Sequence, residues 1–297
     1  MLTRILLGLV ALLVLLVAAA ILFTPIGSLL VWPGSEGELP DFMAGPSDIP
    51  GVQRAAIEGP APLRAKLSYL RSGDGSGRQV IFVHGTPGHA EDWRLVLADP
   101  WPGFEIIAVD RPGFGRSDPA RVMTRIEDQA AALVPLLETR EAGKPILVGW
   151  SLGGPIVARA AIDVSERLGG IVIVAGSLDP DLEEVLFIQR VGQWPMVKPF
   201  LARWARNANA ELIALEAGLR RMAPHLSDIT MPVGIVHGTE DSLVPFENVA
   251  FMKQAMTGAD MVTVTVMEGR NHFMHMNGIP EIKDAVLAVA AASAATP

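Results

Sequence analysis

The chain has 297 residues, half of them hydrophobic, and a formal net charge of −8 at pH 7. It contains no cysteine, which excludes a thiol nucleophile, a cysteine-ligated metal and a disulfide framework. The acidic balance, without any run rich in lysine and arginine, argues against nucleic-acid binding, and the apolar content argues against disorder. The composition fits a folded domain that is large enough to build its own core.

The N-terminus holds the longest apolar run of the chain. Residues Ile5–Phe23 contain no charge, and Gly8 is the one residue outside the apolar set. As an α-helix this run rises about 28 Å, close to the ~30 Å hydrocarbon core of a bilayer. Arg4 precedes the run and the next basic residue is Arg54. The positive-inside rule therefore predicts a cytoplasmic N-terminus and places the rest of the chain outside the cytoplasm.

Two interpretations of this segment compete. The sequence favours an uncleaved signal-anchor over residues 1–24, so that a single-pass protein contacts the lipid bilayer through residues 5–23. The alternative is a cleaved signal peptide and a secreted product, with Ala18–Ala20 as the cleavage site, although the apolar run continues past it. Residues 25–64, which are rich in proline and glycine, are predicted to link this segment to a domain over 65–297.

After residue 65, short apolar runs alternate with segments of helical periodicity. Strands are predicted at Gln79–His84, Phe104–Asp110, Pro145–Trp150, Gly170–Ala175, Pro232–His237 and Met261–Met267, with the first strands within and just before Ala65–Arg71. Helices are predicted at Arg125–Thr139, Leu152–Leu168, Pro245–Met256 and Pro280–Ala292. This pattern predicts an α/β fold with a mostly parallel central sheet and helices on both faces. Ser177–Thr230 lacks a clear strand and is predicted to be an insertion of about three helices.

One motif carries specific chemistry. Residues 149–153 read G-W-S-L-G, between a predicted strand and a predicted helix, which is the context of the G-x-S-x-G nucleophile elbow. Gly149 and Gly153 remove side chains that would crowd a strained turn at Ser151. The N-terminus of the following helix favours a developing oxyanion. Ser151 is therefore the candidate nucleophile.

A serine hydroxyl needs a base, and the base needs an orienting carboxylate. In elbow architectures these residues follow the serine in the order acid, then base. Asp241 follows the predicted strand that ends at His237, and His272 follows the predicted strand that ends at Met267. Both loops belong to the carboxyl edge of the predicted sheet, where open α/β sheets build their sites.

Five motifs in this order resemble those of the α/β-hydrolase fold superfamily: HGTPG at 84–88, DRPGFGRSD at 110–118, GWSLGG at 149–154, HGTEDSLVP at 237–245 and GRNH at 269–272. The resemblance covers residues 65–292 and implies a serine-nucleophile member with a helical cap at about 177–230. It implies that Ser151 is the nucleophile, Asp241 the acid and His272 the base. It also implies an oxyanion hole formed by the backbone N–H groups of Thr86 and Leu152.

Other residues leave alternatives open. Asp179 remains a rival to Asp241, because some superfamily members place the acid in that loop. Trp150, Trp194 and Trp204 are candidates for pocket or cap packing. We expect structural roles for His84 and Asp110, a supporting or surface role for His275, and a solvated Glu240.

The resemblance implies a carboxylesterase- or lipase-like serine hydrolase that cleaves an ester-like bond. With the predicted signal-anchor it becomes a membrane-tethered enzyme, and the apolar cap and the tether favour a small hydrophobic substrate. No cofactor and no metal are expected, because the sequence has no H-E-x-x-H, no P-loop and no complete dinucleotide fingerprint. The alternatives are another reaction of the same triad (aminopeptidase, lactonase, carbon–carbon hydrolase or cofactor-free haloperoxidase) and a weakly catalytic small-ligand receptor. Ser151 argues against epoxide hydrolases and haloalkane dehalogenases, which use aspartate at the elbow.

Overall fold

The computed structural model describes residues 49–61, 63, 65–119 and 121–295. The predicted signal-anchor and residues 25–48 of the predicted linker lie outside this part of the chain. Among the described residues, no helix combines the length and the hydropathy that a bilayer crossing requires.

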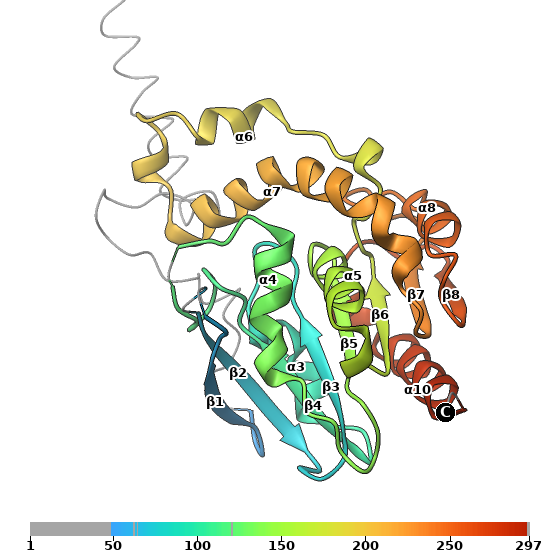
Figure 1. Cartoon of the computed structure of the whole chain (residues 1–297). Coiled ribbons are helices and arrows are strands. Elements are labelled where there is room, and N and C mark those ends of the chain that lie inside the picture. Colours follow the sequence, from blue (N-terminus) through green and yellow to red (C-terminus); the bar gives the residue numbers. More distant parts are fainter. Residues whose placement is uncertain (1–48, 62, 64, 120, 296–297) are drawn as a thin grey trace, which may run out of the picture.

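An eight-stranded sheet forms the centre of the molecule, in the order β1-β2-β4-β3-β5-β6-β7-β8 (Figure 1). The strands are β1 (Gln53–Glu58), β2 (Lys66–Gly73), β3 (Arg78–Val83), β4 (Phe104–Val109), β5 (Ile146–Trp150), β6 (Gly170–Val174), β7 (Val233–Gly238) and β8 (Val262–Met267). β1 pairs antiparallel with β2, and β2 pairs antiparallel with β4. All pairs from β4 to β8 are parallel, which confirms the mostly parallel sheet predicted from the apolar runs.

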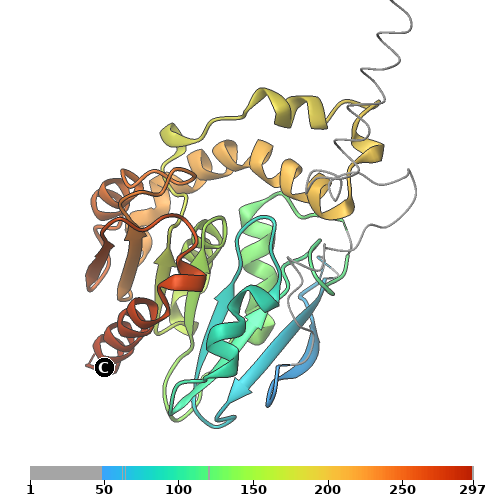
Figure 2. The ribbon, with the colours of Figure 1, turned by 180° about the vertical axis from the view of Figure 1, so that it is seen from behind.

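Helices cover both faces of the sheet (Figures 1 and 2). The longer ones outside the β6–β7 connection are α3 (Arg94–Ala98), α4 (Ile126–Leu133), α5 (Gly153–Asp163), α8 (Asn248–Ala255) and α10 (Ile279–Ala295). Neighbouring strand residues such as Ile81 and Phe82 belong to separate apolar clusters, because side chains alternate between the two faces of a strand. One cluster packs against α4, α5 and α8, and the other against α3 and α10.

Several predicted helix boundaries were wrong. The helix predicted at Arg125–Thr139 ends at Leu133 and continues as a 3₁₀ turn over Val134–Leu136. Pro135 accounts for this, because proline lacks the N–H that an α-helix needs. The short helix α3 lies in a segment for which no helix was predicted.

The connection between β6 and β7 lies across one edge of the sheet (Figures 1 and 2). It contains α6 (Phe187–Gly192), the long helix α7 (Arg203–Met222) and 3₁₀ turns at Pro180–Leu182, Lys198–Phe200 and Ala223–Asp228. Three helices were predicted here, and the structure has one long helix, one short helix and turns. We refer to residues 177–230 as the cap.

A buried ion pair joins the cap to the sheet. Arg111, which follows β4, donates from Nη1 to Oε1 of Glu211 on α7 at 2.6 Å and from Nη2 to Oε2 at 3.1 Å. Both side chains are 1% exposed. Gln129 donates to the same carboxylate at 2.8 Å, and Arg111 also donates to the carbonyl oxygen of Gly85 at 2.7 Å. The cap is thereby connected to the turn that follows β3.

Replacing Glu211 with alanine is expected to lower the free energy of unfolding by about 3–5 kcal/mol, because it leaves the Arg111 charge buried and unpaired. The matched control is Glu216→Ala on the same helix, since Glu216 pairs with Arg220 at the surface. That change should cost about 1 kcal/mol or less. Urea unfolding of both variants in one detergent measures the difference, and equal losses would contradict a special role for the buried pair.

Candidate active site

Ser151 lies in the two-residue turn between β5 and α5. Its φ is 56°, in the left-handed region that residues other than glycine rarely adopt. A Cβ on Gly149 would collide with the carbonyl oxygen of Gly153, and a Cβ on Gly153 would collide with that of Val83. Both glycines are thus required by the close approach of backbone on either side of the serine.

Asp241 and His272 come together from the loops after the neighbouring strands β7 and β8. His272 Nδ1 lies 2.7 Å from Oδ2 of Asp241, and the other carboxylate oxygen accepts the N–H groups of Leu243 at 2.9 Å and Val244 at 2.8 Å. Both side chains are buried. Because the carboxylate accepts, Nδ1 carries the proton, and Nε2 is left as the basic nitrogen of the neutral ring.

The surroundings of Asp241 favour its ionised form. Burial alone would raise the pKa of this carboxyl, but the hydrogen bonds from His272 and the Val244 N–H outweigh it and hold the pKa below the usual value. Asp241 is therefore a carboxylate at neutral pH, and it can stabilise a positive charge on the His272 ring.

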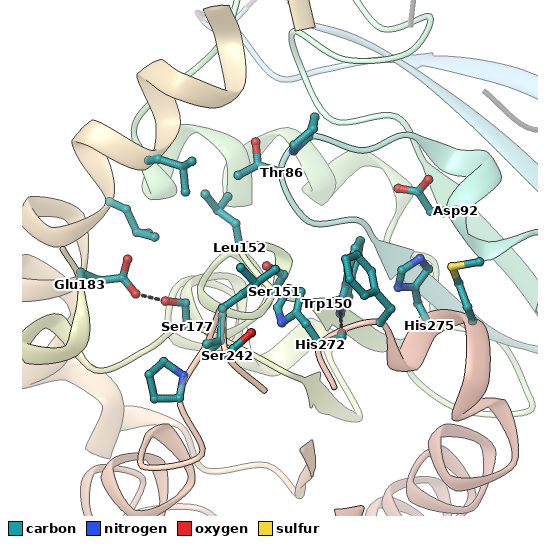
Figure 3. A pocket seen from close by; sticks show the side chains of 18 of the residues that line it. Thr86, Asp92, Trp150, Ser151, Leu152, Ser177, Glu183, Ser242, His272 and His275 are labelled. Carbon is teal, nitrogen blue, oxygen red and sulfur yellow. Dashed lines mark hydrogen bonds between the residues drawn. The ribbon is translucent and has the colours of Figure 1, made fainter. Parts of the chain in front are cut away.

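Ser151 and His272 line one cavity of about 1030 Å³ beneath the cap (Figure 3). Thr86, Leu152 and Trp150 line it too, whereas Asp241 lies behind His272 and does not. The volume is large enough for a medium-sized organic substrate. Leucine side chains from α3, the cap and the loop after β7 form much of the wall: Leu95, Leu182, Leu186, Leu212, Leu215 and Leu243.

Two backbone N–H groups lie close to the serine. Leu152 follows Ser151 directly, and a Cβ on Gly85, the neighbour of Thr86, would lie only 2.9 Å from the Ser151 Cβ. Within the described part of the chain, neither the Thr86 N–H nor the Leu152 N–H donates to a protein acceptor. A pair of unused donors beside a nucleophile can stabilise a developing oxyanion.

The predicted tryptophans have different positions. Trp150 lines the cavity, its Nε1 donates to the carbonyl oxygen of His272 at 3.0 Å, and its ring lies 3.8 Å from that of His275 between centroids. Trp194 is 53% exposed, and neither Trp194 nor Trp204 is among the residues that line this cavity. Trp150 therefore positions the loop that carries His272.

His275 is held as a neutral ring. It lines the cavity, and burial, followed by the nearby His272 and Arg94, lowers its pKa from 6.5 to about 3. Between these two pH values the unfolded chain binds a proton that the folded protein does not bind. The stability that neutral His275 contributes to the fold is thus fully present above pH 6.5 and is lost as the pH falls from 6.5 toward about 3.

His275→Phe keeps an aromatic ring against Trp150 and removes this titration. Between pH 6.5 and pH 4, the free energy of unfolding of the wild type should fall by about 3 kcal/mol more than that of the variant. Urea unfolding at the two pH values, with both proteins in one detergent, measures this difference. Equal losses of unfolding free energy in the wild type and the variant would show that burial does not keep His275 neutral in this pH range.

The remaining candidates are placed as follows. His84 is buried, and its Nε2 accepts the Arg111 N–H at 3.0 Å. Asp110 accepts the N–H groups of Ala90 and Arg116 and so fixes the turn after β4. Asp179 accepts the N–H of Asp181 at the start of a 3₁₀ turn, outside the cavity lining. Glu240 is exposed. The structure pairs His272 with Asp241 and not with Asp179.

Sequence reasoning missed a set of carboxylates in the cavity wall. Glu91 and Asp92 line the cavity from the segment after β3, and Glu183 and Glu184 line it from the cap. Among the described residues that line the cavity, Arg94 is the single lysine or arginine. The two acidic pairs are visible in the sequence, but only folding of the cap over the sheet puts them around one cavity. This lining favours neutral or cationic groups over anions.

Two of these carboxyls bind protons more readily than usual. Burial raises the pKa of Asp92 to about 6, although the charge of His89 and its backbone N–H act in the opposite direction. Burial also raises the pKa of Glu183, whose carboxylate accepts the Ser177 hydroxyl (Figure 3). The negative charge of the cavity therefore grows as the pH rises through about 6.

The fold and the arrangement of Ser151, His272 and the two N–H donors define a protein of the α/β-hydrolase class. Residues 80–285 match the sequence signature of the alpha/beta hydrolase family, and the chain belongs to this family.

The relatives include esterases. A pimeloyl-[acyl-carrier protein] methyl ester esterase from Photorhabdus laumondii subsp. laumondii is 31% identical over 137 residues, 46% of this chain and 46% of the relative. The enzyme of that name from Aeromonas hydrophila subsp. hydrophila is 25% identical over 237 residues, 67% of this chain and 89% of the relative. The chain spans less than half the length of several curated relatives that it matches.

A solved structure also resembles this chain. The crystal structure of a membrane phospholipase A has a TM-score of 0.63 and 19% sequence identity, and the match covers 97% of this chain and 99% of that chain. At this level of identity the similarity shows the fold alone.

Proposed function

We propose that this protein is a membrane-tethered serine hydrolase that cleaves an ester-like bond of a small hydrophobic substrate. One observation carries the proposal. His272 is hydrogen-bonded to Asp241 on one side and lines, with Ser151, a cavity walled by leucines.

The geometry supports acyl transfer in two steps. His272 Nε2 takes the proton of Ser151 as Oγ attacks the carbonyl carbon, and the N–H groups of Thr86 and Leu152 donate to the oxyanion. The intermediate collapses to an acyl-enzyme, and the leaving alcohol receives the proton from His272. Water, deprotonated by His272, then releases the acid and restores the Ser151 hydroxyl. Asp241 stabilises the imidazolium in both steps.

Three observations support an ester and an apolar acyl group. Curated relatives are methyl ester esterases. Leucines form much of the cavity wall. The carboxylates in the wall repel a free carboxylate product and so favour its release.

A substrate panel tests the bond that is cleaved. It contains p-nitrophenyl esters of increasing acyl length, a lactone and an aminoacyl p-nitroanilide, with Ser151→Ala as the blank. The esters should be cleaved with kcat/KM at least about 100-fold above that of the anilide, and kcat/KM should rise with acyl length. A preference for the anilide would indicate an aminopeptidase instead.

The tether is proposed from residues 5–23, with the N-terminus cytoplasmic and the catalytic domain outside. Full-length protein should stay in the membrane after carbonate extraction and leave it in detergent. In right-side-out vesicles, added protease should reach the catalytic domain. Release by carbonate, or protection from protease, would contradict the tether or its orientation.

A further inference from the structure

Large apolar side chains are exposed along one part of the cap. We call residues 186–206 the cap edge. Half of the large hydrophobic side chains that are exposed in the described chain lie there, namely Leu186, Phe187, Ile188, Trp194, Met196 and Phe200. Phe187 is 75% exposed and Met196 is 85% exposed. A contiguous stretch of this kind marks an interaction surface more often than isolated exposed residues do.

The charge of the cap edge is opposite to that of the whole chain. It contains Arg190, Lys198, Arg203 and Arg206 and no aspartate or glutamate, although the chain has a net charge of −8. Arg190 and Lys198 are exposed, and neither forms an ion pair with a residue in the described ranges. Exposed apolar side chains next to exposed cations suit a surface that is apolar inside and anionic at its boundary.

The position of the cap edge connects this surface to the cavity. α6 lies on the outer side of α7, away from the sheet, in both views (Figures 1 and 2). Leu186 is 52% exposed and also lines the cavity that holds Ser151. The exposed apolar surface therefore continues into the cavity wall.

We propose that the cap edge binds the surface of an anionic lipid bilayer. Phe187, Ile188 and Met196 enter the interfacial region, Trp194 lies at headgroup level, and Arg190 and Lys198 contact lipid phosphates. The chain between the apolar run and Ile49 has 25 residues, which reach at most about 85 Å when extended. The predicted tether thus keeps the cap edge within range of the bilayer.

Binding of the cap edge to lipid does not depend on hydrolysis, but it affects how a substrate would reach the proposed active site. A hydrophobic substrate can move from the bilayer past Leu186 to Ser151 without complete exposure to water. A second copy of the chain, or residues 1–48, would cover the same apolar side chains without lipid contact, and the experiment distinguishes these cases.

The cysteine-free sequence allows one label at a chosen site. Met196→Cys is labelled with an environment-sensitive fluorophore in the full-length protein. Leu287→Cys is the matched control, because Leu287 is an exposed apolar residue on α10, at the other end of the molecule. Both are reconstituted in vesicles of phosphatidylcholine and phosphatidylglycerol. At position 196, doxyl-lipid quenching should exceed that at position 287 by at least about threefold, with iodide quenching lower by a similar factor.

Charge reversal tests the electrostatic contribution. With Arg190→Glu and Lys198→Glu added, the ratio of lipid-quenched to water-accessible label at position 196 should fall about tenfold or more. Equal iodide access at both labelled positions would overturn the proposal. Protection from iodide without doxyl-lipid quenching would also overturn it, in favour of a second copy or of residues 1–48. The readout involves no hydrolysis, so its failure is distinguishable from failure of the proposed function.

Discussion

Ser151→Ala should lower kcat for ester hydrolysis by about 10⁶-fold, the order of magnitude found when the nucleophile of a comparable triad is removed. Without the hydroxyl no acyl-enzyme forms, and the remaining rate comes from substrate binding and the oxyanion donors. Steady-state hydrolysis of a p-nitrophenyl ester measures the loss, and burst kinetics of the wild type report the acyl-enzyme.

The matched control is Ser242→Ala. Ser242 lines the same cavity, but it is exposed and lies on the loop after β7. This variant should keep activity close to that of the wild type. If Ser151→Ala hydrolysed the ester at a similar rate to Ser242→Ala, Ser151 would not be the nucleophile.

Asp241→Asn should reduce kcat by about 10⁴-fold, with little change in the fold. The amide retains the shape of the carboxylate, but it removes the charge that stabilises the His272 imidazolium. An amide can also donate to Nδ1, which would place the ring proton on Nε2, the atom that must accept the proton of Ser151.

Asp179→Asn is the control for this effect, because Asp179 was the rival acid in the sequence. Its carboxylate accepts the Asp181 N–H and does not contact His272. We expect almost unchanged kcat from this variant. The opposite result, a large loss from Asp179→Asn and a small loss from Asp241→Asn, would assign the acid to the loop after β6.

The sheet was predictable because its inner strands are buried on both faces. β3, β5, β6 and β7 consist of buried residues throughout, and such strands give apolar runs that stand out from the helical segments. Helix ends were less predictable, because helical periodicity does not show where a proline such as Pro135 converts the last turn into a 3₁₀ turn.

The candidate site was partly predictable for a similar reason. The backbone around Ser151 tolerates only glycine at two positions, so the elbow can be recognised in the sequence as a motif of five consecutive residues. Asp241 and His272 were found from their places after two strands. Glu183 and Asp92 could not be predicted as site residues. They are far apart in the sequence and line one cavity only because the long connection between β6 and β7 folds over the sheet. The tether over residues 5–23 stays a prediction, since it lies outside the described residues.

The central claim is that Ser151 is an activated nucleophile, and fluorophosphonate labelling tests it most directly. Full-length protein is treated with the probe at neutral pH, digested and mapped by mass spectrometry. We predict one stoichiometric adduct on the peptide that carries Ser151, greatly slowed labelling of Asp241→Asn, and no labelling of Ser151→Ala. An unmodified Ser151 in the wild-type protein, or equal labelling of Ser151→Ala, would contradict the claim.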